Sequence, residues 1–115
     1  MKRGDVFWAN LRPRSGSEQG GRRPVVVISH DAFNQTPGWR SVIVVPLSTS
    51  PAQRRRGPTA VAIPRGTAGL GRDGVALCHQ VTTLDRGKLD RRSGSLPPEI
   101  LRDLEAGLRV AMDLC

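Results

Sequence analysis

The residues in this sequence best suited to chemistry are two adjacent arginines, Arg22 and Arg23, which lie between a glycine-rich stretch and an apolar run. The run, Val25–Ile28, is short and β-branched, follows Pro24, and is typical of a buried strand. Guanidinium groups at the start of a rigid strand can hold a phosphate with two parallel hydrogen bonds. The pattern therefore indicates a phosphate-binding site, although a hairpin loop with solvated charges would have the same pattern.

The stretch before these arginines is polar and rich in glycine, so its backbone can fold close to a ligand. It carries Ser17, Glu18 and Gln19, whose side chains can contact the base edges or ribose hydroxyls of single-stranded RNA. The alternative is a loop whose polar side chains only satisfy its own backbone.

Two further features suit RNA binding. Trp39 lies in a polar connection, where its ring could stack on a base or cover an edge of the core. Arg54, Arg55 and Arg56 form a run that could attract phosphate in a non-specific, salt-sensitive way, or could be solvated charge.

Metal and thiol chemistry are disfavoured by the residues. His30 and His79 are the only histidines, and neither has a cysteine or carboxylate at metal-ligand spacing. Cys78 lies in an apolar run and is expected in the core. We therefore expect no metal and no cofactor. A mechanism with two histidines remains open by count, but nothing near either histidine favours it.

RNA can be cleaved without a metal when its own 2′-hydroxyl is the nucleophile, because the protein then supplies only proton transfer and charge stabilisation. Arg23 could neutralise the charge on the reacting phosphorus, and Ser48 or Thr49 could hydrogen-bond the same oxygens from the end of a strand. The high pKa of arginine makes it a poor base, so we expect an electrostatic role for Arg23.

These residues must be positioned by short strands and one helix. The hydrophobic pattern predicts strands over 3–11, 25–28, 41–47, 59–63 and 75–83, turn-rich connections over 30–40 and 65–74, and a short strand or turn over 84–89. A helix opens near Ser95 or Pro97, with a core-facing stripe of Ile100, Leu101, Leu104, Leu108, Ala111 and Met112. We expect a mostly β fold with α, a small antiparallel barrel closed by a C-terminal helix.

The bulk properties fit one basic domain over residues 1–115. The net charge of +8 favours a phosphate polymer or an acidic protein as partner. Cys78 and Cys115 are too few for a disulfide framework, and no apolar segment or leader suggests a membrane or export. We expect a cytoplasmic protein.

Four pieces of sequence in order carry a resemblance. They are RGDVFWANLRPRSGSEQGGRRPVVVIS, VIVVPLSTS, RDGVALCHQVTTLD and the C-terminal helix, and they span nearly the whole chain. The first contains Arg3-Gly4-Asp5-Val6 and Gly16-Ser17-Glu18-Gln19, followed closely by Arg23-Pro24-Val25. In these motifs the chain resembles the MazF/PemK family of toxin endoribonucleases.

The resemblance implies an SH3-like (PemK-like) barrel that cleaves single-stranded RNA such as mRNA at particular sequences, leaving a 2′,3′-cyclic phosphate and a 5′-hydroxyl. It also implies a homodimer with RNA grooves at its interface, and a cognate acidic MazE-like antitoxin that occupies the grooves. The +8 charge suits both RNA and such an antitoxin.

The resemblance also assigns roles by motif. The catalytic arginine before Pro-Val falls on Arg23, and the catalytic threonine after the third strand falls on Ser48, with Thr49 next to it. The loop with Ser17–Gln19 falls in the active site. Gln80 falls near the substrate groove, and His79 stands where many relatives carry an acidic residue.

Two other functions compete with RNA cleavage. A poison of the gyrase-inhibitor type resembles this family in fold and acts through the end of its C-terminal helix on a protein target. A small RNA-binding barrel without chemistry would also use the arginines and the glycine-rich loop.

Overall fold

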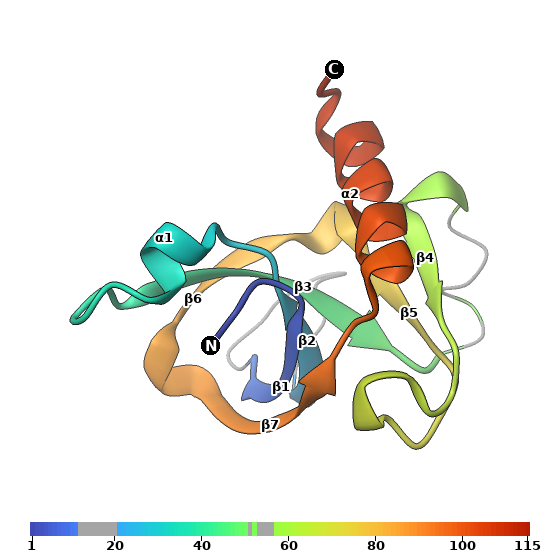
Figure 1. Ribbon diagram of the computed structural model, residues 1–115. Helices are drawn as coiled ribbons and strands as arrows, with labels where there is room; N and C mark the ends of the chain where they lie inside the picture. Colours follow the sequence, from blue (N-terminus) through green and yellow to red (C-terminus); the bar gives the residue numbers. More distant parts are fainter. Residues whose placement is uncertain (12–20, 51, 53–56) are drawn as a thin grey trace.

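The computed structural model spans residues 1–115 and describes residues 1–11, 21–50, 52 and 57–115. A bent antiparallel sheet is flanked by one long helix and one short helix (Figure 1). The strands are β1 (Asp5–Asn10), β2 (Arg22–Val27), β3 (Ser41–Ser48), β4 (Ala60–Ile63), β5 (Gly74–Leu77), β6 (Thr82–Asp85) and β7 (Leu89–Ser95). The α-helices are α1 (Asp31–Asn34) and α2 (Pro98–Met112), and 3₁₀ turns include η3 (Thr67–Gly69), η4 (Cys78–Gln80) and η5 (Arg86–Lys88).

The sheet has seven strands in the order β4-β5-β3-β2-β1-β7, and β6 pairs with β3 beside this path. The long strand β3 organises it, because β6 pairs with its first residues and β5 with its last two. Among the described residues no ladder joins the edge strands β4 and β7. The mostly β fold with a C-terminal helix is therefore confirmed, while the sheet is barrel-like rather than a closed barrel.

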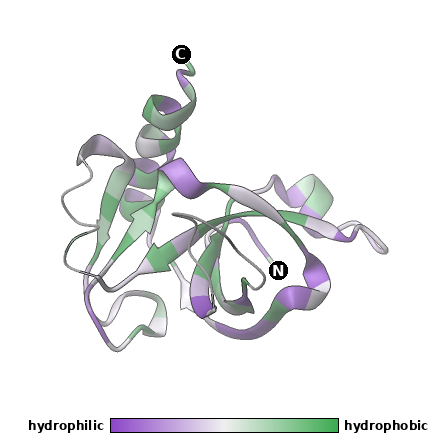
Figure 2. Cartoon of the chain, turned by 180° about the vertical axis from the view of Figure 1, so that it is seen from behind, coloured by the Kyte–Doolittle hydropathy of each residue, from purple (hydrophilic) through white to green (hydrophobic). Residues whose placement is uncertain are grey.

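The central strands bury side chains on both faces, which their near-continuous valine runs explain. One core cluster packs the sheet against α2 and includes Val6, Val26, Val45, Leu104 and Leu108. The other gathers on the opposite face of the same strands and includes Ala9, Val25, Val27, Val42, Val44 and Leu84. Figure 2 shows the apolar strands at the centre of the molecule.

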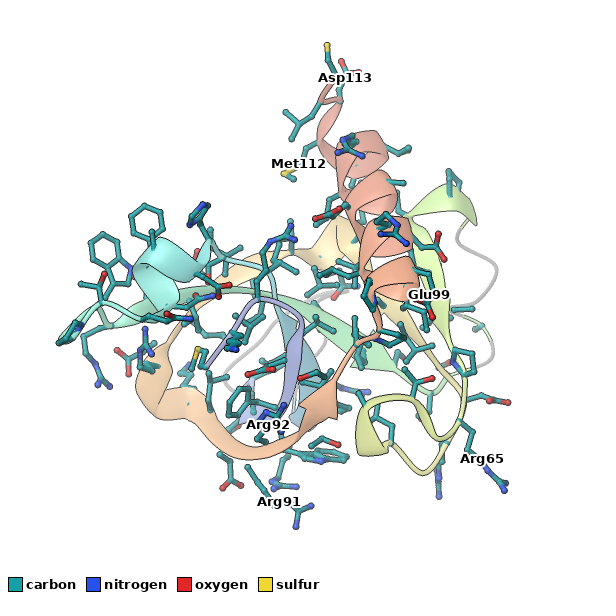
Figure 3. The ribbon with its side chains drawn as sticks, viewed as in Figure 1. Arg65, Arg91, Arg92, Glu99, Met112 and Asp113 are labelled. Carbon is teal, nitrogen blue, oxygen red and sulfur yellow. The ribbon has the colours of Figure 1, made fainter. Side chains whose placement is uncertain are left out.

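The helix α2 confirms the predicted C-terminal helix. Pro98 opens it and Glu99 lies in its first turn, where proline and an acidic side chain both favour a helix start. Leu104 and Leu108 are buried, but Met112 is 46% exposed. The prediction that Met112 faces the core is wrong, because the last turn of α2 extends beyond the sheet (Figure 3).

Three other predictions differ from the structure. Strand β2 begins at Arg22, so the paired arginines lie on the strand rather than before it. The strand predicted over 75–83 is broken by η4 into β5 and β6. Leu89–Ser95 is a strand that its polar sequence did not suggest, because β7 is an edge strand whose residues are mostly exposed.

Candidate active site

A pocket of about 410 Å³ lies where β1, β2 and the end of β3 meet the segment before β5. It brings together four of the predicted site residues, Arg22, Arg23, Ser48 and Thr49. The rest of its lining consists of Trp8, Pro24, Leu47, Leu70, Gly71, Arg72 and Gly74. The pocket therefore combines an apolar wall with three arginines and two hydroxyl groups.

Strand register brings the arginine and the serine together. Val25 of β2 pairs with Pro46 of β3 in antiparallel register. Arg23 and Ser48 each lie two residues beyond this pair, one on each strand. The pairing that builds the core therefore directs residues 23 and 48 toward the same pocket, which both of them line.

The two candidate hydroxyls differ in their surroundings. Ser48 is buried, and its Oγ accepts a hydrogen bond of 3.1 Å from the backbone N–H of Ser50. This contact fixes the side chain while leaving the hydroxyl proton available for donation to a ligand. Thr49 is exposed and also lines the pocket.

The backbone beside Ser48 leaves little space for another side chain. A Cβ added at Gly74 would lie 3.1 Å from the carbonyl oxygen of Ser48. Glycine at the start of β5 therefore lets that strand approach the end of β3 closely.

Arg22 is held between an aromatic ring and a carboxylate. Its guanidinium carbon lies 5.0 Å from the centre of the Trp8 ring, within the range of a cation–π contact. Its Nη2 and Nε donate to Asp90 Oδ2 over 2.7 and 3.2 Å. Both side chains are at least half exposed, so solvent screens this ion pair.

Among the lining residues, sequence reasoning missed Trp8 and Arg72, the aromatic ring and the third arginine. Trp8 pairs with Pro24 across β1 and β2, and this register places it beside the arginines. Arg72 comes from the glycine-rich segment before β5, and its charge amid glycines was the signal available.

Of the other predicted residues, those that the structure describes, Trp39, His79 and Gln80, do not line this pocket. Trp39 precedes the first residue of β3, whereas Ser48 is the last residue of that strand. The ring of Trp39 packs on Phe33, with the ring centroids 4.9 Å apart. Both rings remain more than 40% exposed. His79 and Gln80 lie on η4, which packs against α2. Ser17, Glu18, Gln19, Arg54, Arg55 and Arg56 lie outside the described residues.

The buried thiol is unsuited to nucleophilic chemistry. Cys78 is fully buried, its Sγ donates to the carbonyl oxygen of Leu104 over 3.6 Å, and burial raises its pKa to about 11. The prediction that Cys78 belongs to the core is confirmed. In the part of the chain that the structure describes, no group of three or more histidine, cysteine or acidic residues could hold a metal ion.

The pocket can bind a phosphate and stabilise negative charge on it. Its three arginines, Arg22, Arg23 and Arg72, can interact electrostatically with a phosphate. Next to the arginines, Trp8, Pro24 and Leu70 form an apolar wall that an uncharged ring can pack against. A nucleotide within a polymer has both of these parts.

Comparison with known proteins finds relatives over nearly the full length. Residues 2–112 match a family described as PemK-like, MazF-like toxin of type II toxin-antitoxin system. The chain is 36% identical over 114 residues to Endoribonuclease EndoA of Bacillus subtilis (strain 168), covering 99% of this chain and 96% of that protein. It is 33% identical over 114 residues to Endoribonuclease MazF of Staphylococcus saprophyticus, covering 99% and 92%.

Solved structures agree with this similarity. MazF from Deinococcus radiodurans superposes with a TM-score of 0.81 at 27% identity, covering 98% of this chain and 96% of that chain. A MazE-MazF structure from the same organism gives a TM-score of 0.74 at 26% identity, covering 100% and 97%. None of the helices in the described part of the chain is long and apolar enough to cross a membrane.

Proposed function

The chain belongs to the PemK-like, MazF-like family of toxins of type II toxin–antitoxin systems, and from this we propose that it is a sequence-specific endoribonuclease that cleaves single-stranded RNA without a metal. The observation that carries the proposal is the pocket in which Arg23 meets Ser48 and Thr49. A phosphodiester is the group that this combination of donors fits best.

In the proposed reaction the 2′-oxygen of a ribose attacks the adjacent phosphorus. The P–O2′ bond forms and the P–O5′ bond breaks, giving a 2′,3′-cyclic phosphate and a 5′-hydroxyl. The proton of the 2′-hydroxyl passes to a water molecule, and the leaving 5′-oxygen takes a proton from water. Arg23 and the hydroxyl of Ser48 or Thr49 donate hydrogen bonds to the non-bridging oxygens, whose charge grows in the transition state.

We assign recognition of the RNA sequence to the residues that the sequence predicts to contact RNA. We assign base contacts to Ser17, Glu18 and Gln19, because their loop leads directly into β2 and its arginines. The remaining predicted RNA contacts are Arg22, Trp39, Arg54, Arg55, Arg56, His79 and Gln80. Arg22 lines the pocket, which supports its assignment.

Relatives suggest the partners. The Deinococcus radiodurans MazF has been solved together with MazE, so we propose that a cognate acidic antitoxin binds this chain and competes with RNA. The net charge of +8 supports attraction to both. We further propose a homodimer that acts on mRNA in the cytoplasm.

The test is cleavage of a long, defined single-stranded RNA in EDTA, with the ends mapped by primer extension. The variants are Arg23→Ala and, as a matched control, Arg102→Ala, which removes an exposed arginine from α2. We expect discrete cuts from the wild type and the control, and cleavage slower by about 10²- to 10³-fold from Arg23→Ala.

Other outcomes would replace the proposal. RNA left intact by the wild type, with RNA binding retained, would favour a binding module without chemistry. Intact RNA without binding would favour a poison of a protein target. Cleavage that is lost in EDTA would overturn the metal-free mechanism.

A further inference from the structure

A second pocket, of about 660 Å³, adjoins the first. Its lining is polar and apolar in nearly equal parts and comes from the end of β1, the start of β2, η5 and the start of β7: Asn10, Arg22, Gly87, Lys88, Leu89 and Asp90. Arg22 lines both pockets, so its side chain stands on the boundary between them. The two pockets therefore meet at the side chain of Arg22.

In the ion pair at this boundary, a phosphate can replace the carboxylate of Asp90 on the guanidinium of Arg22. Asp90 occupies the guanidinium of Arg22, but the two side chains are 61% and 50% exposed. An ion pair so exposed contributes little stability, and a phosphate can replace a carboxylate on the same guanidinium. The Trp8 ring keeps the guanidinium in place from the side of the first pocket.

The second pocket has the groups that a nucleotide needs. Lys88 supplies a positive point charge for a phosphate. Asn10 supplies an amide that both donates and accepts hydrogen bonds, as a base edge requires. Leu89 adds a partly buried apolar contact.

We propose that the second pocket holds the nucleotide next to the one in the first pocket, and that Arg22 exchanges Asp90 for the phosphate between them. This inference rests on the proposed function, which supplies single-stranded RNA as the ligand. Asp90 then acts as an internal anion that competes with RNA, so removing its charge strengthens RNA binding.

The test measures binding without cleavage. The probe is a fluorescein-labelled pool of 2′-fluoro RNA decamers of random sequence, which lack the 2′-hydroxyl nucleophile, and the readout is fluorescence anisotropy at several salt concentrations. Asp90→Asn is compared with Asp103→Asn, which removes the same charge from the exposed side of α2. Lys88→Gln is compared with Lys2→Gln, which removes the charge of another exposed lysine.

Each variant has a distinct expected result. Asp90→Asn binds more tightly than Asp103→Asn, by up to about fivefold. Lys88→Gln binds more weakly than Lys2→Gln, and the slope of log K against log salt falls by about 0.7. In an Arg22→Gln background, Asp90→Asn no longer differs from Asp103→Asn, because the exchange has no guanidinium to act on.

The inference and the proposed function fail in different ways. When the wild type binds the probe, equal binding by Asp90→Asn and Asp103→Asn, or equal binding by the two lysine variants, would overturn the nucleotide site in the second pocket and leave the nuclease standing. The expected binding pattern with no cleavage of ordinary RNA would instead overturn the nuclease and leave the nucleotide site standing.

Discussion

At the scale of single residues, the proposed reaction depends on which hydroxyl group in the pocket of Arg23 donates to the phosphate. Ser48 is buried and its Oγ accepts from the backbone N–H of Ser50, whereas Thr49 is exposed. A fixed donor costs less to organise in the transition state than a mobile one. This difference favours Ser48 as the donor to the phosphate.

We expect Ser48→Ala to lower kcat by about 10²-fold or more, because one donor to the developing charge is lost. Thr49→Ala should lower kcat much less. The measurement is the cleavage rate of a short RNA containing the mapped site, under saturating substrate, with thermal denaturation confirming the fold of each variant.

Ser48→Thr is the matched control, because it keeps the hydroxyl and should retain most of the activity. The reverse order, with Thr49→Ala the more damaging variant, would assign the donor to Thr49.

How far the sequence predicted the site depended on the kind of residue. Arg23 and Ser48 were candidates from the sequence because each lies at one end of an apolar strand, and those strands pair. Trp8 and Arg72 were missed, because pocket membership depends on strand register and on how the glycine-rich segment before β5 folds. The ring of Trp39 stacks on Phe33, a contact set by the turn between them.

At the scale of elements, β7 and η3 hold the wall of the pocket. Ser93 Oγ of β7 donates to the carbonyl oxygen of Ala68 over 2.8 Å. A Cβ added at Gly94 would lie 2.6 to 2.9 Å from backbone atoms of Ala68, so this close approach requires glycine. The segment that follows η3 supplies Leu70 and Arg72 to the pocket.

We expect Gly94→Ala to force these elements apart and to lower the melting temperature by roughly 3–15 °C, since overpacking costs about 1–3 kcal/mol. It should also raise KM for RNA, because the wall carrying Arg72 moves. The measurements are thermal denaturation and steady-state cleavage. Gly71→Ala is the stability control, since its added methyl meets open space and should leave the melting temperature nearly unchanged.

The sequence predicted an element where burial of one face gives its residues a periodic apolar pattern. Helix α2 has an apolar stripe that only a helix would bury, so its sequence predicts it. Strand β7 is polar and exposed and is held by pairing with β1, so its own sequence does not reveal it. The open edges of β4 and β7 within the described residues are likewise a property of distant strands rather than of any one segment.

At the scale of the whole molecule, the stability of a chain with net charge +8 depends on the negative charges of its carboxylates. Burial alone would raise the pKa of Asp5, but hydrogen bonds from Ser95, Lys2 and Arg92 outweigh it and lower the pKa. A backbone hydrogen bond from Arg3 and a side-chain bond from Asn34 lower the pKa of Asp31. Protonating either group removes these contacts and increases the net positive charge.

We therefore expect stability to fall with acid. A carboxyl group whose pKa is lower in the folded state stabilises the fold above its unfolded value, near 3.8, and this contribution is lost as pH decreases further. Melting temperatures measured from pH 7 to pH 2 should drop below about pH 4. Asp5→Asn should be less stable at pH 7 and show a shallower acid decline, whereas Asp103→Asn should follow the wild type throughout.

The difference in exposure between the two thiols makes their reactivity a measure of how often the fold opens. Cys115 is exposed, whereas Cys78 is sealed beneath α2, where even a methyl group on Gly107 would lie 2.8 Å from its sulfur. A disulfide reagent such as DTNB should therefore modify one thiol per chain at once, and the second only when α2 lifts from the sheet. The slow phase reports the opening of the fold directly, and binding of RNA or an antitoxin to the folded protein would lengthen it.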